Sequence, residues 1–141
     1  MNLLIINGPN LNMLGVREPS VYGNQPFEVS LKKLRQLYPE HVIEYYHSNI
    51  EGEIIDTLQK AGLLYDAVIL NAGGYTHTSV AIADAIRAIR IPVVEVHISN
   101  LSTRESFRHT SLISPAVTGL IMGFGMDGYR LAIESLLKKL S

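Results

Sequence analysis

Two side chains of one polar segment have the types needed for a general base. Arg17 and Tyr22 lie between residues 8 and 23, directly after an apolar run at residues 3–6. A free tyrosine titrates near ~10, too high for a base at neutral pH. A guanidinium beside a phenol favours the phenolate, which can accept a proton. The alternative is an aromatic anchor beside a solvated arginine, and the pair alone favours that alternative.

The segment that carries this pair is long for a connection after a buried strand. It also holds Asn10 and Asn12, and no helical pattern resumes until about Glu28. Most such loops are short, and loops that leave the carboxyl ends of strands usually carry the ligand site. We therefore expect this segment to be a mobile lid that carries part of the chemistry.

A second candidate pair lies on an apolar run at residues 93–98. Period-two alternation places Glu95 and His97 on the same side of the expected strand. A carboxylate beside an imidazole favours the protonated ring and fixes its tautomer, which suits a proton donor. The alternative is a core histidine satisfied by a carboxylate, and the polar turn that follows, beginning Ile98-Ser99, favours a functional role.

Further polar residues follow other expected strands. His77 and Asp84 are seven residues apart and would share one helix face, although a polar surface stripe is the commoner explanation. Asn71 could orient a substrate hydroxyl or cap a turn. Arg104 and Arg108 could bind a carboxylate or hydroxyls, or could pair with a neighbouring acid and solvent.

The elements that must position these residues alternate between short apolar runs and helical patterns. We expect strands at residues 3–6, 42–46, 67–70, 93–98 and 117–122, with helices at residues 28–38, 48–62, 79–90 and 128–140. Ser48 and Glu51 predict a capping box at the second of these helices. Repeated βα units predict one parallel sheet with helices on both faces, and right-handed crossovers favour an open, doubly wound sheet. Among five-stranded sheets of this kind we choose strand order 2-1-3-4-5. The strands' carboxyl ends then meet at one edge, where the polar clusters should converge.

Composition limits the classes of function. The 141 residues fit a single domain, 1–141, and a net charge of -1 favours neither nucleic acid nor an anionic membrane. The absence of cysteine excludes thiol nucleophiles and thiolate metal sites. No apolar stretch approaches ~18 residues, and the amino terminus lacks a basic region, so we expect no membrane span, no signal peptide and a cytoplasmic location.

One motif invites a different function. Residues 123–128 form a G-x-G-x-x-G sequence, which could indicate a nucleotide-linked oxidoreductase. It follows the last strand, however, and no acidic residue lies ~20 positions on, so we interpret it as a glycine-rich turn that allows close packing. All five lysines fall on predicted helices, which leaves Schiff-base chemistry without a candidate. A non-catalytic flavodoxin-like binding module is a further alternative, but residues 8–11 are not its expected phosphate loop.

Taken together, these residues resemble one family, the type II 3-dehydroquinate dehydratases. The resemblance runs along nearly the whole chain. It rests on Gly-Pro-Asn-Leu-Asn at 8–12, Arg-Glu-Pro at 17–19, Tyr-Gly at 22–23, Ser-Asn at 48–49, Glu-Gly-Glu at 51–53, Asn71, Tyr-Thr-His-Thr-Ser at 75–79, Glu-Val-His at 95–97, Ser-Asn at 99–100, Arg-Glu at 104–105 and Phe-Arg-His at 107–109.

The resemblance implies a flavodoxin-like three-layer fold and an enzyme that needs neither a cofactor nor a metal. The implied reaction converts 3-dehydroquinate to 3-dehydroshikimate and water by anti elimination through an enolate, in the shikimate pathway or in quinate catabolism. The implied base is Tyr22, with Arg17 stabilising the phenolate and the transition state and Asn10 helping to hold the enolate through a water. The implied acid is His97, oriented by Glu95.

Substrate binding follows from the same resemblance. The implied substrate-binding residues are Asn71, His77, Asp84, Ile98, Ser99 and Arg108. The family also implies a dodecamer of four trimers, in which Asp84 reaches a neighbouring subunit's site. Four positions depart from the family pattern, namely Ala72, Gly74, Ala83 and Ile50, where proline, alanine, arginine and histidine are frequent. None of the four has an implied catalytic role.

Overall fold

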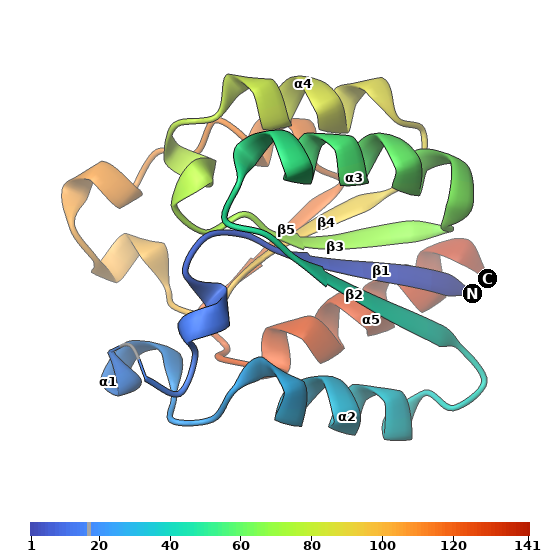
Figure 1. Ribbon diagram of the computed structural model, residues 1–141, viewed down its shortest axis with the longest axis horizontal. Coiled ribbons are helices and arrows are strands. Elements are labelled where there is room, and N and C mark those ends of the chain that lie inside the picture. Colours follow the sequence, from blue (N-terminus) through green and yellow to red (C-terminus); the bar gives the residue numbers. More distant parts are fainter. Residues whose placement is uncertain (17) are drawn as a thin grey trace.

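The sheet has the strand order that the sequence predicts. The computed structural model describes residues 1–16 and 18–141. Its five parallel strands run in the order β2-β1-β3-β4-β5 (Figure 1). Their bounds are β1 Asn2–Asn7, β2 Val42–His47, β3 Ala67–Asn71, β4 Val93–His97 and β5 Gly119–Met122. The prediction of an α/β, flavodoxin-like doubly wound sheet is confirmed.

Helices cover both faces of this sheet. In Figure 1, α3 and α4 lie over one face, and α2 and α5 lie over the other. The helices are α1 Pro19–Tyr22, α2 Phe27–Leu37, α3 Glu51–Leu64, α4 Val80–Ala88 and α5 Asp127–Leu140, with short 3-10 helices η1 Leu11–Met13, η2 Gly73–His77, η3 Leu101–Thr103, η4 Ser106–Arg108 and η5 Ser114–Ala116. Among the described residues, no helix has the length and apolar character that crossing a bilayer requires.

The apolar run of β1 explains why it forms a central strand. Leu3 and Ile5 pack into the core beneath α2 and α5, whereas Leu4 and Ile6 pack into the core beneath α3 and α4. All four side chains are buried. A strand buried on both faces reads as a continuous apolar run rather than an alternating one. The two cores hold the sheet rigidly, so the loops at its carboxyl edge have a fixed base.

The expected capping box at the start of α3 is wrong. The N-cap is Ile50, and it makes no side-chain capping bond. Ser48 Oγ instead accepts from the Ile50 amide and donates to the Glu53 carboxylate, five residues along the chain. The Ser48 amide, which a capping box would pair with Glu51, donates instead to the Asn7 carbonyl, which explains why the spacing rule failed.

Several boundaries also differ from the sequence expectation. Helix α3 begins at Glu51 and continues to Leu64, past the expected end at Gly62. Strand β5 begins at Gly119, because residues 114–116 form the turn η5 and the Val117 amide bonds back to Ser114. Helix α4 begins at Val80 rather than Ser79, because Ser79 Oγ accepts from the Ile82 amide as an N-cap. It ends at Ala88, since Ile89 is extended.

The glycine motif at residues 123–128 is a packing turn, as predicted. Gly123 and Gly125 have φ of 93° and 60°, a left-handed conformation that disfavours residues with a Cβ. A Cβ at Gly123 would lie 3.1 Å from Asn100 Cβ, and one at Gly128 would lie 3.1 Å from Val96 Cγ1. The glycines therefore allow the turn and the start of α5 to approach β4 closely.

Candidate functional site

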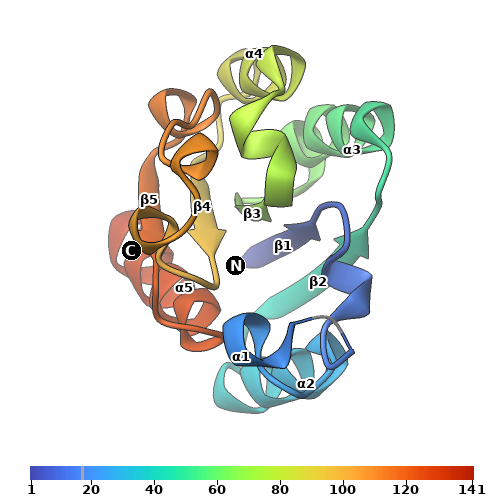
Figure 2. The same ribbon diagram turned by 90° about the vertical axis from the view of Figure 1, so that its left-hand side faces the viewer.

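The polar clusters converge at the carboxyl edge of the sheet, which faces the viewer in Figure 2. A cavity of about 140 Å³ opens there, between the loops that follow β1, β3 and β4. Eight of the eleven candidate residues line it: Asn10, Tyr22, Asn71, His77, His97, Ile98, Ser99 and Arg108. Of the other three, Glu95 lies behind His97, Asp84 lies elsewhere, and Arg17 lies outside the described residues.

The phenol of Tyr22 contacts a guanidinium. Arg104 Nη1 donates to Tyr22 Oη at 2.8 Å, and Arg104 Cζ lies 5.5 Å from the centre of the Tyr22 ring. Arg104 Nη2 also lies 3.9 Å from the Glu18 carboxylate, on the same lid segment. Helix α1, which carries Tyr22, buries no side chain. The observed contacts with Arg104 are therefore polar ties between this short helix and the body of the protein.

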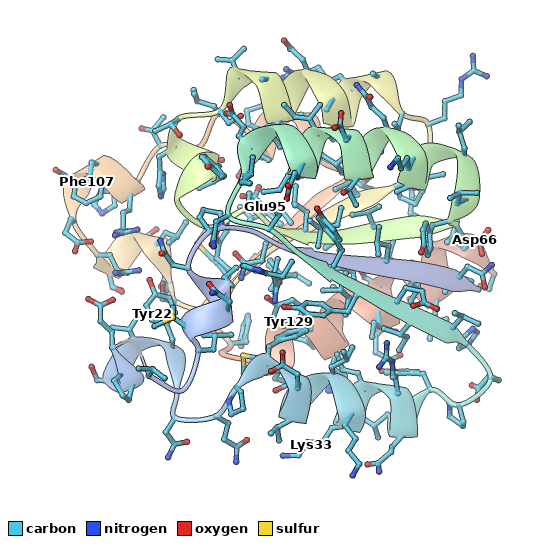
Figure 3. All side chains as sticks on the ribbon, in the orientation of Figure 1. Tyr22, Lys33, Asp66, Glu95, Phe107 and Tyr129 are labelled. Atoms are coloured by element: carbon cyan, nitrogen blue, oxygen red, sulfur yellow. The ribbon has the colours of Figure 1, made fainter. Side chains whose placement is uncertain are left out.

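The imidazole of His97 is backed by a buried carboxylate, as period-two alternation on β4 predicts. Glu95 has no exposed surface, and its Oε2 lies 2.5 Å from His97 Nε2. In Figure 3 the labelled Glu95 lies inside the fold, whereas Tyr22 lies at the loop end. Burial by itself raises the pKa of the Glu95 carboxyl, but hydrogen bonds and charge from His97, and hydrogen bonds from Ser114 and Thr76, outweigh it and hold the pKa below its ordinary value.

Both asparagines at the site have structural partners. Asn71 Oδ1 accepts from the Gly73 amide at 3.1 Å, which is the turn-capping alternative that the sequence left open. Asn71 Nδ2 also donates to the buried Tyr129 hydroxyl at 3.0 Å. Asn10 has a left-handed backbone with φ of 69° and is tied through its amide to Asn49 Oδ1 at 2.9 Å. These bonds fix both backbones while both residues still line the cavity.

The remaining lining residues present polar groups from two loops, those that follow β3 and β4. His77 Nδ1 lies 2.7 Å from the Thr110 carbonyl oxygen, which orients the ring. Arg108 Nε donates to the Glu105 carboxylate at 2.7 Å, so the acid pairing considered from sequence is present. Ser99 follows the buried Ile98, and its Oγ accepts a long bond of 3.5 Å from Arg104 Nη1.

The expectation that His77 and Asp84 share one helix face is wrong. His77 ends the 3-10 helix η2, whereas Asp84 lies on α4, after the Ser79 cap. The Asp84 side chain is 71% exposed, and its Oδ1 lies 3.9 Å from Arg87 Nη1. Within this chain, Asp84 therefore has no place among the residues that line the cavity.

Sequence reasoning missed part of this site. Arg104 and Arg108 are four residues apart, and nothing in the sequence indicates that Arg104 rather than Arg108 bonds Tyr22. Thr76 and Ser114, which bond Glu95, carried no motif at all. Only the fold brings loops after β3 and β4 together behind the carboxylate, so the signal for these hydroxyls is spatial rather than sequential.

The comparisons with known proteins agree with this arrangement. The family model described as "Dehydroquinase class II" matches residues 1–137. A protein named 3-dehydroquinate dehydratase from Clostridium beijerinckii is 52% identical over 145 residues, covering 100% of this chain and 99% of that protein. One of the same name from Fusobacterium nucleatum is 51% identical over 144 residues, covering 98% and 97%.

A solved structure is similar over the same length. The type II dehydroquinase from Butyrivibrio crossotus superposes with a TM-score of 0.94 at 44% sequence identity, covering 97% of each chain. Both the sequence match and the superposition span the loops that build the cavity. The chain therefore belongs to the class II dehydroquinase family.

Proposed function

We propose that this chain is a hydro-lyase that converts 3-dehydroquinate to 3-dehydroshikimate and water. The proposal places it in the cytoplasm, in the shikimate pathway or quinate catabolism, with residues 1–141 acting as one catalytic domain. Family membership supports the reaction class. The observation that carries the mechanism is that Tyr22 and His97 line one cavity from two different elements. A base and an acid on separate elements suit an elimination that removes a proton and a hydroxyl from neighbouring carbons.

The first step is proton abstraction. The Tyr22 phenolate takes the C2 proton, and the C–H electron pair moves toward the C3 carbonyl to give an enolate. Arg104 Nη1 donates to Tyr22 Oη at 2.8 Å and holds the phenol oxygen at the cavity wall. In this proposal Arg17 stabilises the phenolate and the transition state, and Asn10 helps to hold the enolate through a water.

The second step expels water. The enolate electrons return to form the C1–C2 double bond, the C1–oxygen bond breaks, and His97 gives a proton to the departing hydroxyl. Glu95 orients His97 through the bond to Nε2. A preorganised donor at a developing oxyanion supplies on the order of 3 kcal/mol of transition-state stabilisation.

Substrate recognition uses the rest of the cavity wall. The Ile98-Ser99 turn grips the substrate carboxylate with backbone amides and a hydroxyl, and Arg108 and His77 meet ring hydroxyls. Asn71 lies at the base of the same cavity. The fixed backbone at Asn71 and Ile98 supports this arrangement, because a rigid wall orients a ring better than a free loop does.

The simplest test is turnover of 3-dehydroquinate, followed by the ultraviolet absorbance of the conjugated enone in the product. We expect turnover by the untreated protein, and equal turnover after borohydride treatment in the presence of substrate, because no imine forms in this mechanism. The untreated enzyme in the same buffer is the control. Inactivation by borohydride only when substrate is present would reveal a lysine imine and would contradict the mechanism.

The proposal includes a dodecamer of four trimers in which Asp84 completes a neighbour's site. Its exposure on α4, away from its own chain's cavity, supports this role. If sites are shared, a site in a mixed oligomer can combine Tyr22 of one chain with Asp84 of another. Mixing Asp84→Ala chains with Tyr22→Phe chains under conditions of subunit exchange should then restore about a quarter of wild-type activity, as expected for random assembly.

The two variants taken separately through the same dissociation and reassembly are the controls for this mixing experiment. Chains carrying different tags would report the exchange itself. No gain of activity in mixtures whose chains have exchanged would argue against a shared site.

A further inference from the structure

A chain of hydroxyl groups lies behind the candidate acid. The buried Glu95 carboxylate accepts from Ser114 Oγ through Oε1 at 2.6 Å, and its Oε2 lies 2.6 Å from Thr76 Oγ1. Thr76 Oγ1 is also hydrogen-bonded to Ser111 Oγ. Glu95 and Thr76 both have no exposed surface. The hydrogen-bond partners of Glu95 are therefore protein side chains, and the donor and acceptor in each of these bonds can be assigned from the other bonds that the partners make.

The direction is fixed at Ser111. Its Oγ accepts from two backbone amides, Ile113 at 3.1 Å and Ser114 at 2.9 Å. A hydroxyl oxygen has two lone pairs and one hydrogen. With both lone pairs used, Ser111 must donate its hydrogen to Thr76 Oγ1. Thr76 then has its own hydrogen left, and that hydrogen points at Glu95 Oε2.

This polarity sets the state of the Glu95–His97 pair. With Thr76 donating to Oε2, a proton on that same oxygen would face another donor, so Oε2 acts as an acceptor. The lowered pKa of Glu95 agrees with an ionised carboxylate. His97 Nε2 must therefore be the donor in its bond to Oε2. The ring nitrogen that remains for exchange with a ligand is Nδ1.

We propose that Thr76 and Ser111 are positioning residues that hold the Glu95 carboxylate as an acceptor, so that His97 keeps its hydrogen on Nε2 while Nδ1 takes up a proton from solvent and, as the imidazolium, delivers it to the departing hydroxyl. The second half of this statement rests on the dehydratase function proposed above. Fixing a histidine tautomer through an outer hydrogen bond is a general way to prepare an acid or a metal ligand. Neither Thr76 nor Ser111 is among the described residues that line the cavity, so their proposed action is through Glu95.

The test uses Thr76→Val, which keeps the shape of the side chain and removes its hydroxyl. Thr76→Ser restores the hydroxyl, and Thr57→Val is the matched control, because the Thr57 hydroxyl bonds only the Glu53 carbonyl of its own helix in the structure. The full-length protein labelled with ¹⁵N-histidine reports the His97 tautomer by NMR, with the His97 signal assigned by its loss in His97→Asn. Steady-state turnover separates kcat from KM.

For the wild-type protein we expect the Nε2–H tautomer of the neutral ring. In Thr76→Val we expect a measurable Nδ1–H population and a fall in kcat of about tenfold. This value is the low end of the loss seen when the outer hydrogen bond of a metal-binding histidine is removed. KM should change less than kcat, since no substrate contact is removed. Thr76→Ser should recover most of the loss, and Thr57→Val should match the wild type.

Three results would overturn the inference. The first is an Nδ1–H tautomer of His97 in the wild type, and the second is an unchanged kcat and tautomer in Thr76→Val. The third is a fall in kcat in Thr76→Ser as large as that in Thr76→Val, which would indicate an effect of packing alone. If Thr76→Val fails to fold, Ser111→Ala provides the same comparison, because it frees Thr76 to reverse its hydrogen. The tautomer is measured without substrate, so the two proposals can fail separately. A wild-type protein with no turnover would refute the proposed function, whereas the NMR measurement would still show which nitrogen of His97 carries the hydrogen.

Discussion

Tyr22→Phe is expected to lower kcat by about 10²–10⁴-fold, the contribution of a positioned general base. Substrate affinity should stay close to that of the wild type. The phenylalanine ring can keep its place beside the Arg104 guanidinium, which lies 5.5 Å from the Tyr22 ring centre. What disappears is the oxygen that accepts the proton. Turnover measured by enone absorbance and substrate binding measured by calorimetry would separate these two effects.

Tyr46→Phe is the matched control for this experiment. It removes a tyrosine hydroxyl that bonds Glu53 at 3.3 Å on β2 and does not line the cavity. We expect its kcat to equal that of the wild type. A near-normal kcat in Tyr22→Phe would remove Tyr22 from the mechanism.

His97→Asn should be the second severe variant, again with a loss in kcat on the order of 10²–10⁴-fold. The asparagine amide can still donate a hydrogen bond toward Glu95, so the buried carboxylate keeps a partner and the fold should survive. The amide cannot carry a transferable proton, so the departing hydroxyl loses its donor. Thermal unfolding and kcat measured on the same sample would show an intact fold without turnover.

His41→Asn serves as the control for the histidine change. His41 Nδ1 lies 2.9 Å from the amino-terminal nitrogen, at the opposite edge of the sheet from the cavity. We expect full activity in that variant. If His97→Asn kept kcat within a factor of about ten of the wild type, an acid other than His97 would have to be sought.

The fold was predictable because its signals are local. Continuous apolar runs such as residues 3–6 occur where a strand is buried on both faces, and helical spacing between those runs implies parallel crossovers. Right-handed crossovers predicted an open, doubly wound sheet, and the strand order chosen among such sheets is confirmed. The pairing of Glu95 with His97 followed from strand periodicity alone. These features depend on near neighbours in the chain, which a sequence displays directly.

The parts that escaped prediction depend on distant segments. The pairing of Arg104 with Tyr22 joins residues 82 positions apart, and no local pattern selects one arginine over the next. Ser48 bonds Glu53 rather than forming the expected box, because its amide already donates to the Asn7 carbonyl on β1. Thr76 and Ser111 meet only because loops after β3 and β4 fold against each other. Small hydroxyl residues are common in loops, so their role is invisible before the loops are placed.

The short helix α1, which buries no side chain, has a consequence for how the protein could be inhibited. The imidazole is anchored in an inner strand of the sheet, whereas the phenol lies on a short helix, and its ring is only partly buried against the core. The two halves of the reaction thus differ in mechanical stiffness. A compound that takes the place of the Tyr22 ring would displace a partly buried side chain and its hydrogen bond from Arg104, and it would remove the proposed base while the rest of the scaffold stays intact.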